Sequence, residues 1–398
     1  MPSETDSAER ARSLIARARA LVPVLAERAA RADAERRLPP ESIADFRDAG
    51  FFRILQPKRW GGYELHPRVF YQVQMTLAQG CASSGWVFGV IGVHNWQLAL
   101  FDPRAADDVW RNDDAVLISS SYMPKGQVKR VTGGFQFSGR WSFSSGVDHA
   151  DWVFLGAIVM PEGDQPGSPD FRTFLVPRAD FEVVDTWHVM GFKGTGSKDV
   201  VVKDAFVPEY RTHSVRDGFS GTSPGLATNT AALYKLPFGQ VFVRAVSAAS
   251  IGGLQGALDA FRDFGRTRIS ANDFSATAQD PSAQLAASSA AAAIDEMKLE
   301  LFQSFDAMMA TLERGEQLEI KDRIHYRYQS ARAADRCVEQ VSKLFRSAGA
   351  SAIFSGNPIL RFFLDIHAAR AHFANNADRF GRNYGGVLLG LQNGDLFL

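Results

Sequence analysis

A cluster of polar side chains lies between two tryptophans near the middle of the chain. Residues 139–152 read GRWSFSSGVDHADW, with three serines, a glycine and a histidine between Trp141 and Trp152. Hydroxyl and imidazole groups that are buried without a partner destabilise a fold. The stretch therefore indicates either a turn or a place where a ligand binds.

Three further histidines have side chains suited to acid–base chemistry. His94, His367 and His372 all titrate near neutrality unless the fold shifts them. His367 and His372 are five residues apart, which on a helix separates them by about 140° around the axis, so they cannot both face one substrate ring. The same spacing disfavours a metal site, whose helical ligands lie three or four residues apart. We expect no bound metal.

The composition limits the classes of partner. The chain has 398 residues, with 44 lysines and arginines against 44 aspartates and glutamates. This length suggests two or three packed domains, and the balanced charge predicts no nucleic-acid partner and no anionic membrane surface. Its two cysteines, Cys81 and Cys337, make neither a disulfide framework nor a metal cluster. No window has the composition of a membrane span, so we expect a soluble, cytoplasmic protein whose partners are small molecules or copies of itself.

The periodicity of apolar residues divides the chain into three parts. We expect an N-terminal helical domain (1–115), a central antiparallel β-domain (116–208), and a loop with a C-terminal helical bundle (209–398). Apolar residues repeat at helical spacing from Ser7 to about Ala34. Short strand-like runs such as FQFSGRWSF and WVFLGAIV alternate with Gly, Pro and Asp clusters in the second part. The predicted fold class is α+β.

The third part opens with a glycine- and serine-rich stretch, residues 209–240, that is typical of an ordered functional loop. Helices are expected from Pro281 onward, over 322–348, and over 358–379. No glycine fingerprint for a nicotinamide dinucleotide is present in the sequence.

Local phrases in this order resemble a known superfamily. LPPESIADFRDAGFFRILQPKRWGG and GFKGTGSKDVVVKDAFVP are similar to segments of the acyl-CoA dehydrogenase fold. Within that fold, GVHNWQLALF, ISSSYMP, WSFSSGVDHADW and ILRFFLDIHAARAH resemble the oxygenase components of two-component flavin monooxygenases, most closely those that hydroxylate a phenolic secosteroid. The chain differs from the latter at Phe143, near Leu364 and after Gly385, which affects the expected substrate more than the chemistry.

The resemblance implies a flavin monooxygenase reaction and a partner. The expected cofactor is reduced FMN, with FADH2 as the alternative. O2 is the expected co-substrate, and a C4a-hydroperoxyflavin is expected to hydroxylate a phenolic ring ortho to its hydroxyl. The expected substrate class is a phenol, with steroid-derived and polycyclic phenols as candidates. A separate NAD(P)H flavin reductase supplies the reduced flavin, and the expected assembly is a homotetramer.

The resemblance also implies which residues hold the flavin. The strand WSFSSG runs beside the flavin ring, which implies that Ser145 contacts the ring edge near N5; a fixed hydrogen bond in a dry pocket prolongs the life of a reactive flavin adduct. The alternative interpretation of Ser145 is a hydroxyl that merely satisfies a strand end. The resemblance implies that the segment GFKGTGS (191–197) holds a phosphate through backbone amides of a glycine-containing loop. Without the resemblance, the same segment indicates only a turn. The remaining cofactor-binding candidates are Ser120, Ser121, Trp141, Ser144 and Arg266, of which only one of the two consecutive strand serines 120 and 121 can face the pocket.

A phenol needs a base, because loss of its proton makes the ortho carbon electron-rich. The resemblance implies that His372 is this base, that His94 orients the phenol, and that His367 packs the helix. For His94, a buried histidine bonded to the backbone is the competing interpretation. The substrate-binding candidates are His94, Trp96, Ser121, Phe143 and His372.

Other functions remain open on the same sequence. An acyl-CoA dehydrogenase needs a carboxylate base, and the C-terminal helix offers no obvious glutamate for it. An N- or S-oxygenating flavin monooxygenase needs no phenol-activating base. A protein that has lost flavin chemistry and only binds a partner is the third alternative.

Overall fold

The first part of the chain is helical. A computed structural model describes residues 4–161, 168–269 and 274–398. The helix α3 begins at Pro67, where the ring of His66 accepts a hydrogen bond from the Arg68 amide and caps the first turn. The helices of this part are α1 (Glu4–Glu35), α2 (Pro40–Asp48), α3 (Pro67–Gly80), α4 (Ala82–Leu98) and α5 (Pro103–Trp110).

The central part is one seven-stranded sheet with the order β5-β6-β2-β1-β3-β4-β7. Its neighbours pair antiparallel, as expected, except that β1 and β3 run parallel, with Ile118 opposite Trp152. The reason is that the segment after β2 crosses the start of β1 instead of turning back, so that β3 adds on the other side of β1. The strands are β1 (Ile118–Val131), β2 (Gly134–Ser144), β3 (Trp152–Val159), β4 (Asp170–Pro177), β5 (Phe181–Val184), β6 (Lys198–Pro208) and β7 (Thr212–Ser214).

The boundary expected at residue 208 falls inside the sheet, because β7 still pairs with β4. The segment expected as a loop, residues 209–240, holds the short helix α6 (Val215–Ser220) and three 3-10 turns. The bundle then consists of α7 (Phe238–Thr267), α8 (Pro281–Glu313), α9 (Ile320–Ala348), α10 (Pro358–Arg370) and α11 (Ala377–Leu388).

The helix expected over 358–379 is broken. α10 ends at Arg370, a 3-10 turn (η11, Phe373–Asn375) follows, and α11 begins at Ala377. Asn375 is the cause, because its buried side-chain amide donates to the Ala369 carbonyl at the end of α10 and to the Val246 carbonyl on α7. The prediction that His367 and His372 share one helix is therefore wrong.

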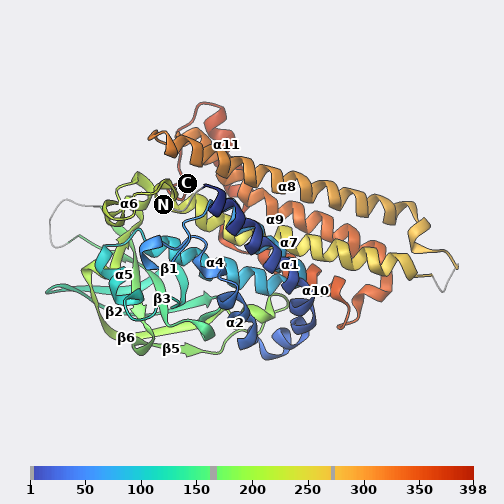
Figure 1. Cartoon of the computed structure of the whole chain (residues 1–398), viewed down its shortest axis with the longest axis horizontal. Coiled ribbons are helices and arrows are strands. Elements are labelled where there is room, and N and C mark those ends of the chain that lie inside the picture. Colours follow the sequence, from blue (N-terminus) through green and yellow to red (C-terminus); the bar gives the residue numbers. More distant parts are fainter. Residues whose placement is uncertain (1–3, 162–167, 270–273) are drawn as a thin grey trace.

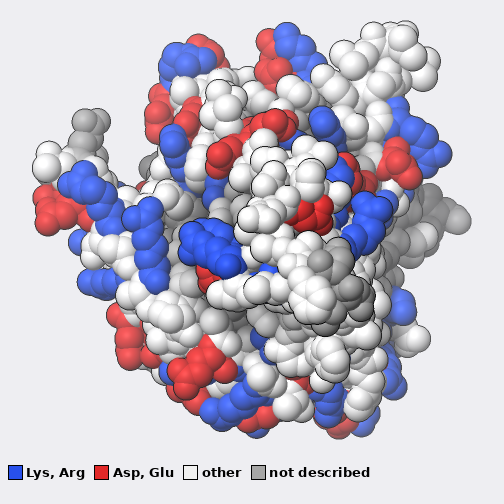
Figure 2. Space-filling model, turned by 90° about the vertical axis from the view of Figure 1, so that its right-hand side faces the viewer, with Lys and Arg blue, Asp and Glu red and all other residues white. Residues whose placement is uncertain are grey.

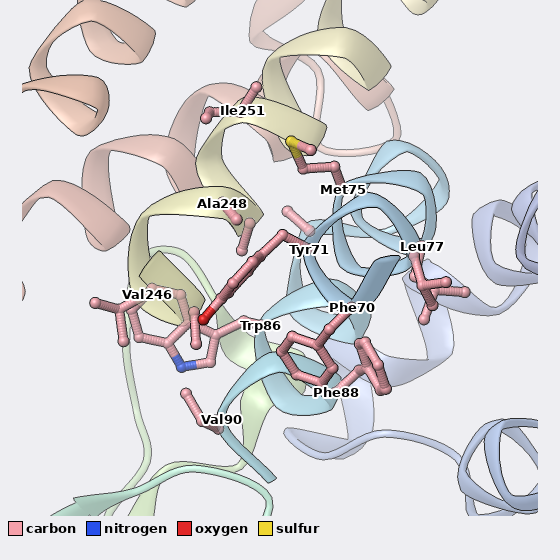
Figure 3. Packing of buried hydrophobic residues seen from close by; sticks show 14 of the residues in the cluster. Phe70, Tyr71, Met75, Leu77, Trp86, Phe88, Val90, Val246, Ala248 and Ile251 are labelled. Atoms are coloured by element: carbon pink, nitrogen blue, oxygen red, sulfur yellow. The ribbon is translucent and has the colours of Figure 1, made fainter. Parts of the chain in front are cut away.

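The helix α4 joins the sheet to the bundle (Figure 1). It packs against β1 on one side and α3 and α7 on the other, and all 17 of its residues are buried. In Figure 3, Trp86 of α4 lies beside Val246 of α7 and close to Tyr71 of α3. A helix that is enclosed on every side is fixed in orientation, so α4 can hold functional side chains rigidly.

The helix α7 is long and apolar enough to cross a membrane by length and composition, but 89% of its most apolar window is buried inside the protein. Such burial is that of a core helix. Basic and acidic side chains are interspersed over the face shown in Figure 2, in keeping with the balanced composition.

Candidate active site

The end of β2 aims the Ser145 hydroxyl out of the sheet. The register of β2 with β6 shifts between Trp141 and Ser144, and Phe143 adopts a left-handed conformation with φ of 66°. Bulges of this kind redirect side chains at the end of a strand. As a result Ser145 leaves the ladder and reaches α4, where its Oγ accepts a hydrogen bond of 3.0 Å from Trp86 Nε1.

Ser145 also begins a chain of hydroxyl groups. Its Oγ is 2.7 Å from Ser197 Oγ, which is 2.6 Å from Thr195 Oγ1. Thr195 Oγ1 in turn donates to the Phe192 carbonyl at 2.8 Å. All three hydroxyl side chains are buried, so the segment expected to bind phosphate supports Ser145 with its side chains.

Four backbone amides of residues 191–197 already have acceptors within the protein. The amides of Thr195 and Gly196 donate to carbonyls within the same turn. The Phe192 amide donates to Asp365 Oδ1 at 2.5 Å, and the Gly194 amide bonds Asp33. These four amides already have acceptors, so a phosphate held by this segment would have to bind its other amides.

His94 is held as a tautomer with a free lone pair. It is fully buried on α4, and its Nδ1 lies 2.6 Å from the Ile118 carbonyl at the start of β1. A carbonyl only accepts, so Nδ1 carries the proton of the neutral ring and Nε2 carries a lone pair. Nε2 is buried and has no partner among the described residues. Burial lowers the pKa of His94 to about 4, which keeps the ring neutral.

His372 is held in the opposite tautomer. It precedes the 3-10 turn η11, and its Nδ1 accepts a hydrogen bond of 3.1 Å from the Ala374 amide. The proton of the neutral ring must then lie on Nε2. Burial and the positive charge of Arg327 lower the pKa of His372 to about 4, and Arg327 also donates to the Ala374 carbonyl at 2.9 Å. His372 therefore offers a proton at Nε2 and no lone pair.

Aromatic rings connect these groups. Trp86 lies edge-on to His372 with ring centres 5.7 Å apart. The ring centre of Phe242 on α7 lies 6.4 Å from the ring centre of His94 and 6.5 Å from that of His372. The structure thus brings Ser145 and His372 together at Trp86, and His94 and His372 together at Phe242.

Ser120 and Ser121 point to opposite faces of β1, as expected. Ser121 Oγ donates to the Ser142 carbonyl on β2 at 2.7 Å, which uses its only proton. The Ser120 hydroxyl bonds the phenol of Tyr122, which itself donates to Gln97 on α4. The ring of Tyr122 lies 5.0 Å from Phe242, so Ser120 shares the face that holds the aromatic cluster.

Three predicted site residues lie elsewhere in the core. Trp141 is fully buried inside the sheet, its ring packs tilted against Phe137, and its Nε1 donates to the Gly156 carbonyl. Ser144 Oγ is bonded to Ser119 Oγ within the protein. Trp96 is fully buried and donates to the Leu233 carbonyl. Because each polar atom already has a partner and no surface is exposed, these three side chains are part of the packing.

Two predicted residues lie on the surface. The ring of Phe143 is 62% exposed and lies edge-on to Trp187. Arg266, near the end of α7, is 69% exposed, and among the described residues it pairs only with Asp263 of the same helix, at 3.8 Å. Both are accessible to a bound molecule or another subunit.

His367 lies on the packed face of α10, against the Phe363 ring at 4.3 Å, with Nε2 3.3 Å from Ser342 Oγ.

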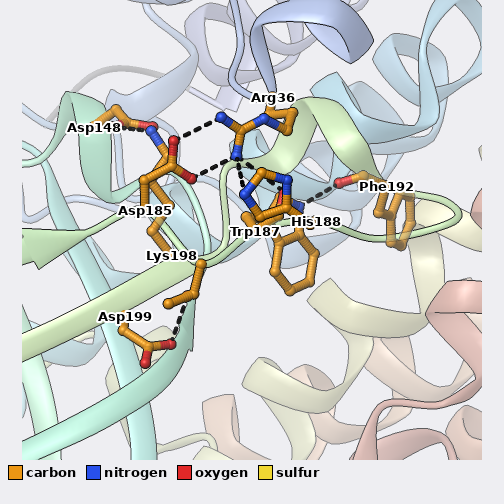
Figure 4. A network of polar contacts seen from close by, with 9 residues as sticks. Arg36, Asp148, Asp185, Trp187, His188, Phe192, Lys198 and Asp199 are labelled. Atoms are coloured by element: carbon orange, nitrogen blue, oxygen red, sulfur yellow. Dashed lines mark hydrogen bonds and ion pairs between the residues drawn. The ribbon is translucent and has the colours of Figure 1, made fainter.

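A separate polar network holds the segment before Phe192 (Figure 4). There Arg36 bonds both carboxylate oxygens of Asp185, and Trp187 Nε1 donates to the Phe192 carbonyl at 2.9 Å. The network fixes the same carbonyl at which the hydroxyl chain ends.

Several residues of this site escape sequence reasoning as site residues. Phe242 and Arg327 stand out in the sequence only as parts of helices, whereas Trp86 is one of four aromatic residues, with Trp96, Trp141 and Phe143, that could line an apolar aromatic pocket. Thr195 and Ser197 lie in a motif whose glycines suggest backbone contacts, whereas their hydroxyls make the contacts here. Only the tertiary contacts distinguish these residues from ordinary core.

Comparisons with known proteins agree with the geometry. Residues 8–101 match the acyl-CoA dehydrogenase N-terminal domain and residues 245–377 match the acyl-CoA dehydrogenase C-terminal domain. The chain is 42% identical to the flavin-dependent monooxygenase oxygenase subunit HsaA of Rhodococcus jostii, over 94% of this chain and 97% of the relative. It is 31% identical to the oxygenase component of the FADH(2)-dependent resorcinol hydroxylase of a Rhizobium species, over 95% and 94%. The crystal structure of 3-HSA hydroxylase from Rhodococcus sp. RHA1 superposes with a TM-score of 0.92 at 41% identity, covering 97% of this chain and 99% of that one.

Proposed function

Because the chain belongs to the oxygenase components of flavin-dependent monooxygenases built on the acyl-CoA dehydrogenase fold, we propose that it hydroxylates a phenolic ring next to the phenol hydroxyl. The reaction uses O2 and a reduced flavin. The resorcinol hydroxylase among its relatives acts on a phenol by name, which supports the substrate class.

The residues at the end of β2 suit a reduced flavin. Ser145 offers a buried hydroxyl oxygen beside the indole of Trp86, and we propose that it bonds the N5 edge of the flavin ring. Bound reduced flavin supplies the two electrons that activate O2. The protein contributes by fixing Ser145 and by surrounding the ring with the aromatic side chains of α4 and α7, which exclude water.

We assign the base to His94 in place of His372. A base must present a lone pair to the phenol O–H, and the neutral His94 ring has one at Nε2. His372 has its lone pair tied to the Ala374 amide. We propose that His372 donates its Nε2 proton to an oxygen in the same pocket, so the two histidines orient the substrate by complementary hydrogen bonds.

The lining supports an apolar ring as substrate. Tyr122, Phe238 and Phe242 pack edge-to-face or stacked, with ring centres 5.0 to 5.3 Å apart, beside His94. A steroid-derived or polycyclic phenol agrees with this aromatic wall. Phe143 and Ser120 are proposed to contact the substrate or the flavin from the sheet side.

The electrons come from a separate reductase. The relatives are named as oxygenase subunits or components, and no nicotinamide fingerprint is present in the sequence. The FMN preference expected from the sequence is a prediction; one relative is named for FADH(2), so titration with both reduced flavins decides between them.

We propose that the enzyme assembles as a homotetramer in the cytoplasm, with Arg266 reaching the flavin phosphate of a neighbouring subunit. Its exposure at the end of α7 supports this role. Sedimentation of the flavin-loaded enzyme tests the assembly. A dilute monomer that retains full activity contradicts it.

The observation that carries the proposed function is the buried, unpartnered Nε2 of His94, which lies beside aromatic rings and calls for a donor such as a phenol. The test is anaerobic mixing with reduced flavin, then O2, with a panel of phenols and with matched methyl ethers as controls. We expect catechol products from the free phenols only. Formation of H2O2 without any hydroxylated product, or reduction of bound oxidised FAD by an acyl-CoA, contradicts the proposal.

A further inference from the structure

We infer that Thr195 and Ser197 fix the direction of the Ser145 hydroxyl, so that the site distinguishes reduced from oxidised flavin. The inference rests on the proposed function, in that Ser145 must lie beside the flavin N5. It assigns a positioning role to two residues that do not themselves touch the flavin.

The direction of the chain is set at its far end. The Phe192 carbonyl can only accept, and it lies 2.8 Å from Thr195 Oγ1. Two oxygens at this distance repel each other unless a proton lies between them, so the single proton of Thr195 points to Phe192. Ser197, 2.6 Å away, must then donate to Thr195.

The same reasoning reaches Ser145. Because Ser197 has given its proton to Thr195, the 2.7 Å contact between Ser197 and Ser145 needs the proton of Ser145. Trp86 Nε1 is a donor only and occupies one lone pair of Ser145 Oγ. Ser145 is left with one lone pair and no proton to offer.

The end of the chain cannot easily move. The Phe192 amide is bonded to the buried Asp365 carboxyl on α10, and its carbonyl also accepts from Trp187 Nε1. Figure 4 shows Trp187 bonded to Phe192 beside the Arg36 network. Thr195 and Ser197 are 1% and 4% exposed, so water cannot replace either neighbour in the chain.

An oxygen that only accepts discriminates between the two redox states of a flavin. Reduced flavin carries N5–H, a donor, whereas N5 of oxidised flavin has only a lone pair. The first pairs with Ser145 and the second is repelled by it. This arrangement therefore favours release of oxidised flavin. Such release suits an oxygenase that takes reduced flavin from another protein and returns it oxidised.

The test is the ratio of dissociation constants for oxidised and reduced flavin, measured by anaerobic titration with FMN and with FAD. Thr195→Val keeps the side-chain shape and removes the oxygen, so Ser197 can donate to Ser145 and Ser145 can turn its proton outward. Ser197→Ala frees Ser145 directly and serves if the first variant does not fold. We expect both variants to lower the ratio by about 10-fold, the effect of one hydrogen bond.

A control variant separates the chain of hydroxyl groups from general loss of a buried contact. Ser330→Ala removes a hydroxyl that is bonded to Ser247 between α7 and α9. It should leave the ratio unchanged. An unchanged ratio in Thr195→Val and Ser197→Ala, with a lowered ratio in Ser145→Ala, overturns the inference alone. If Ser145→Ala also leaves the ratio unchanged, the inference fails because Ser145 does not bond N5. A wild-type protein that binds neither flavin refutes the proposed function.

Discussion

His94 and His372 are held in opposite tautomers beside the same phenylalanine, Phe242. The Ile118 carbonyl takes the proton of His94 at Nδ1, and the Ala374 amide takes the lone pair of His372 at Nδ1. The free nitrogen of the first ring is therefore an acceptor and that of the second a donor. This difference gives each histidine a distinct test.

His94→Ala should slow hydroxylation by roughly 100-fold to 10,000-fold at neutral pH, the range for a lost general base. The defect should shrink as the pH approaches about 10, because the phenol then ionises in solution and needs no base. Single-turnover hydroxylation against pH measures both effects. His367→Ala, which alters a packed histidine on α10, is the control and should show no alkaline recovery.

His372→Leu and His372→Gln form a matched pair. Glutamine keeps an N–H donor whereas leucine removes it, so we expect the leucine variant to hydroxylate about 10-fold to 100-fold more slowly than the glutamine variant, as for one lost hydrogen bond in a buried site. Neither variant should recover at alkaline pH. Recovery in His372→Leu together with its absence in His94→Ala would return the base role to His372.

The order of domains and most helix starts were predictable because their signals are local. Pro281 and Pro358 begin helices as expected. The break after α10 was not predictable, since residues 371–379 retain helical composition and the deciding bond runs from Asn375 to Val246 on a distant helix.

The site shows the same division between local and tertiary signals. Motifs drew attention to Ser145, His94 and His372, but the tautomers depend on Ile118 and Ala374, and the support of Ser145 depends on residues fifty positions away. The candidates Trp141 and Ser144 lie in the same motif as Ser145, yet the bulge in β2 turns only Ser145 toward α4. Spacing alone cannot reveal such a bulge.

Trp141→Phe tests whether that tryptophan serves packing. The variant loses the hydrogen bond to the Gly156 carbonyl inside the sheet, which should lower the free energy of unfolding by about 1–3 kcal/mol. Affinity for reduced flavin should stay unchanged in the folded variant. A large loss of flavin affinity at unchanged stability would place Trp141 at the cofactor after all.

Asp365→Asn should change how stability depends on pH. Burial raises the pKa of the Asp365 carboxyl to about 7, with Asp33 opposing and Arg361 and Lys193 favouring its ionisation. The folded protein therefore keeps a proton that the unfolded chain loses near pH 4. Since the folded state binds more protons between about pH 4 and 7, this group's contribution to stability is complete below that range and is lost as pH rises through it, by up to about 4 kcal/mol.

Asparagine cannot ionise and keeps an oxygen for the Phe192 amide, which Asp365 now binds. Asp365→Asn should thus lose less stability than the wild type between pH 5 and pH 8. Thermal or urea unfolding of both proteins at the two pH values gives the comparison. The buried histidines, whose lowered pKa values act in the opposite direction, are present in both proteins and cancel in the difference. If stability falls equally in the two proteins between these pH values, Asp365 is ionised in the folded protein at neutral pH, with its charge balanced by Arg361 and Lys193.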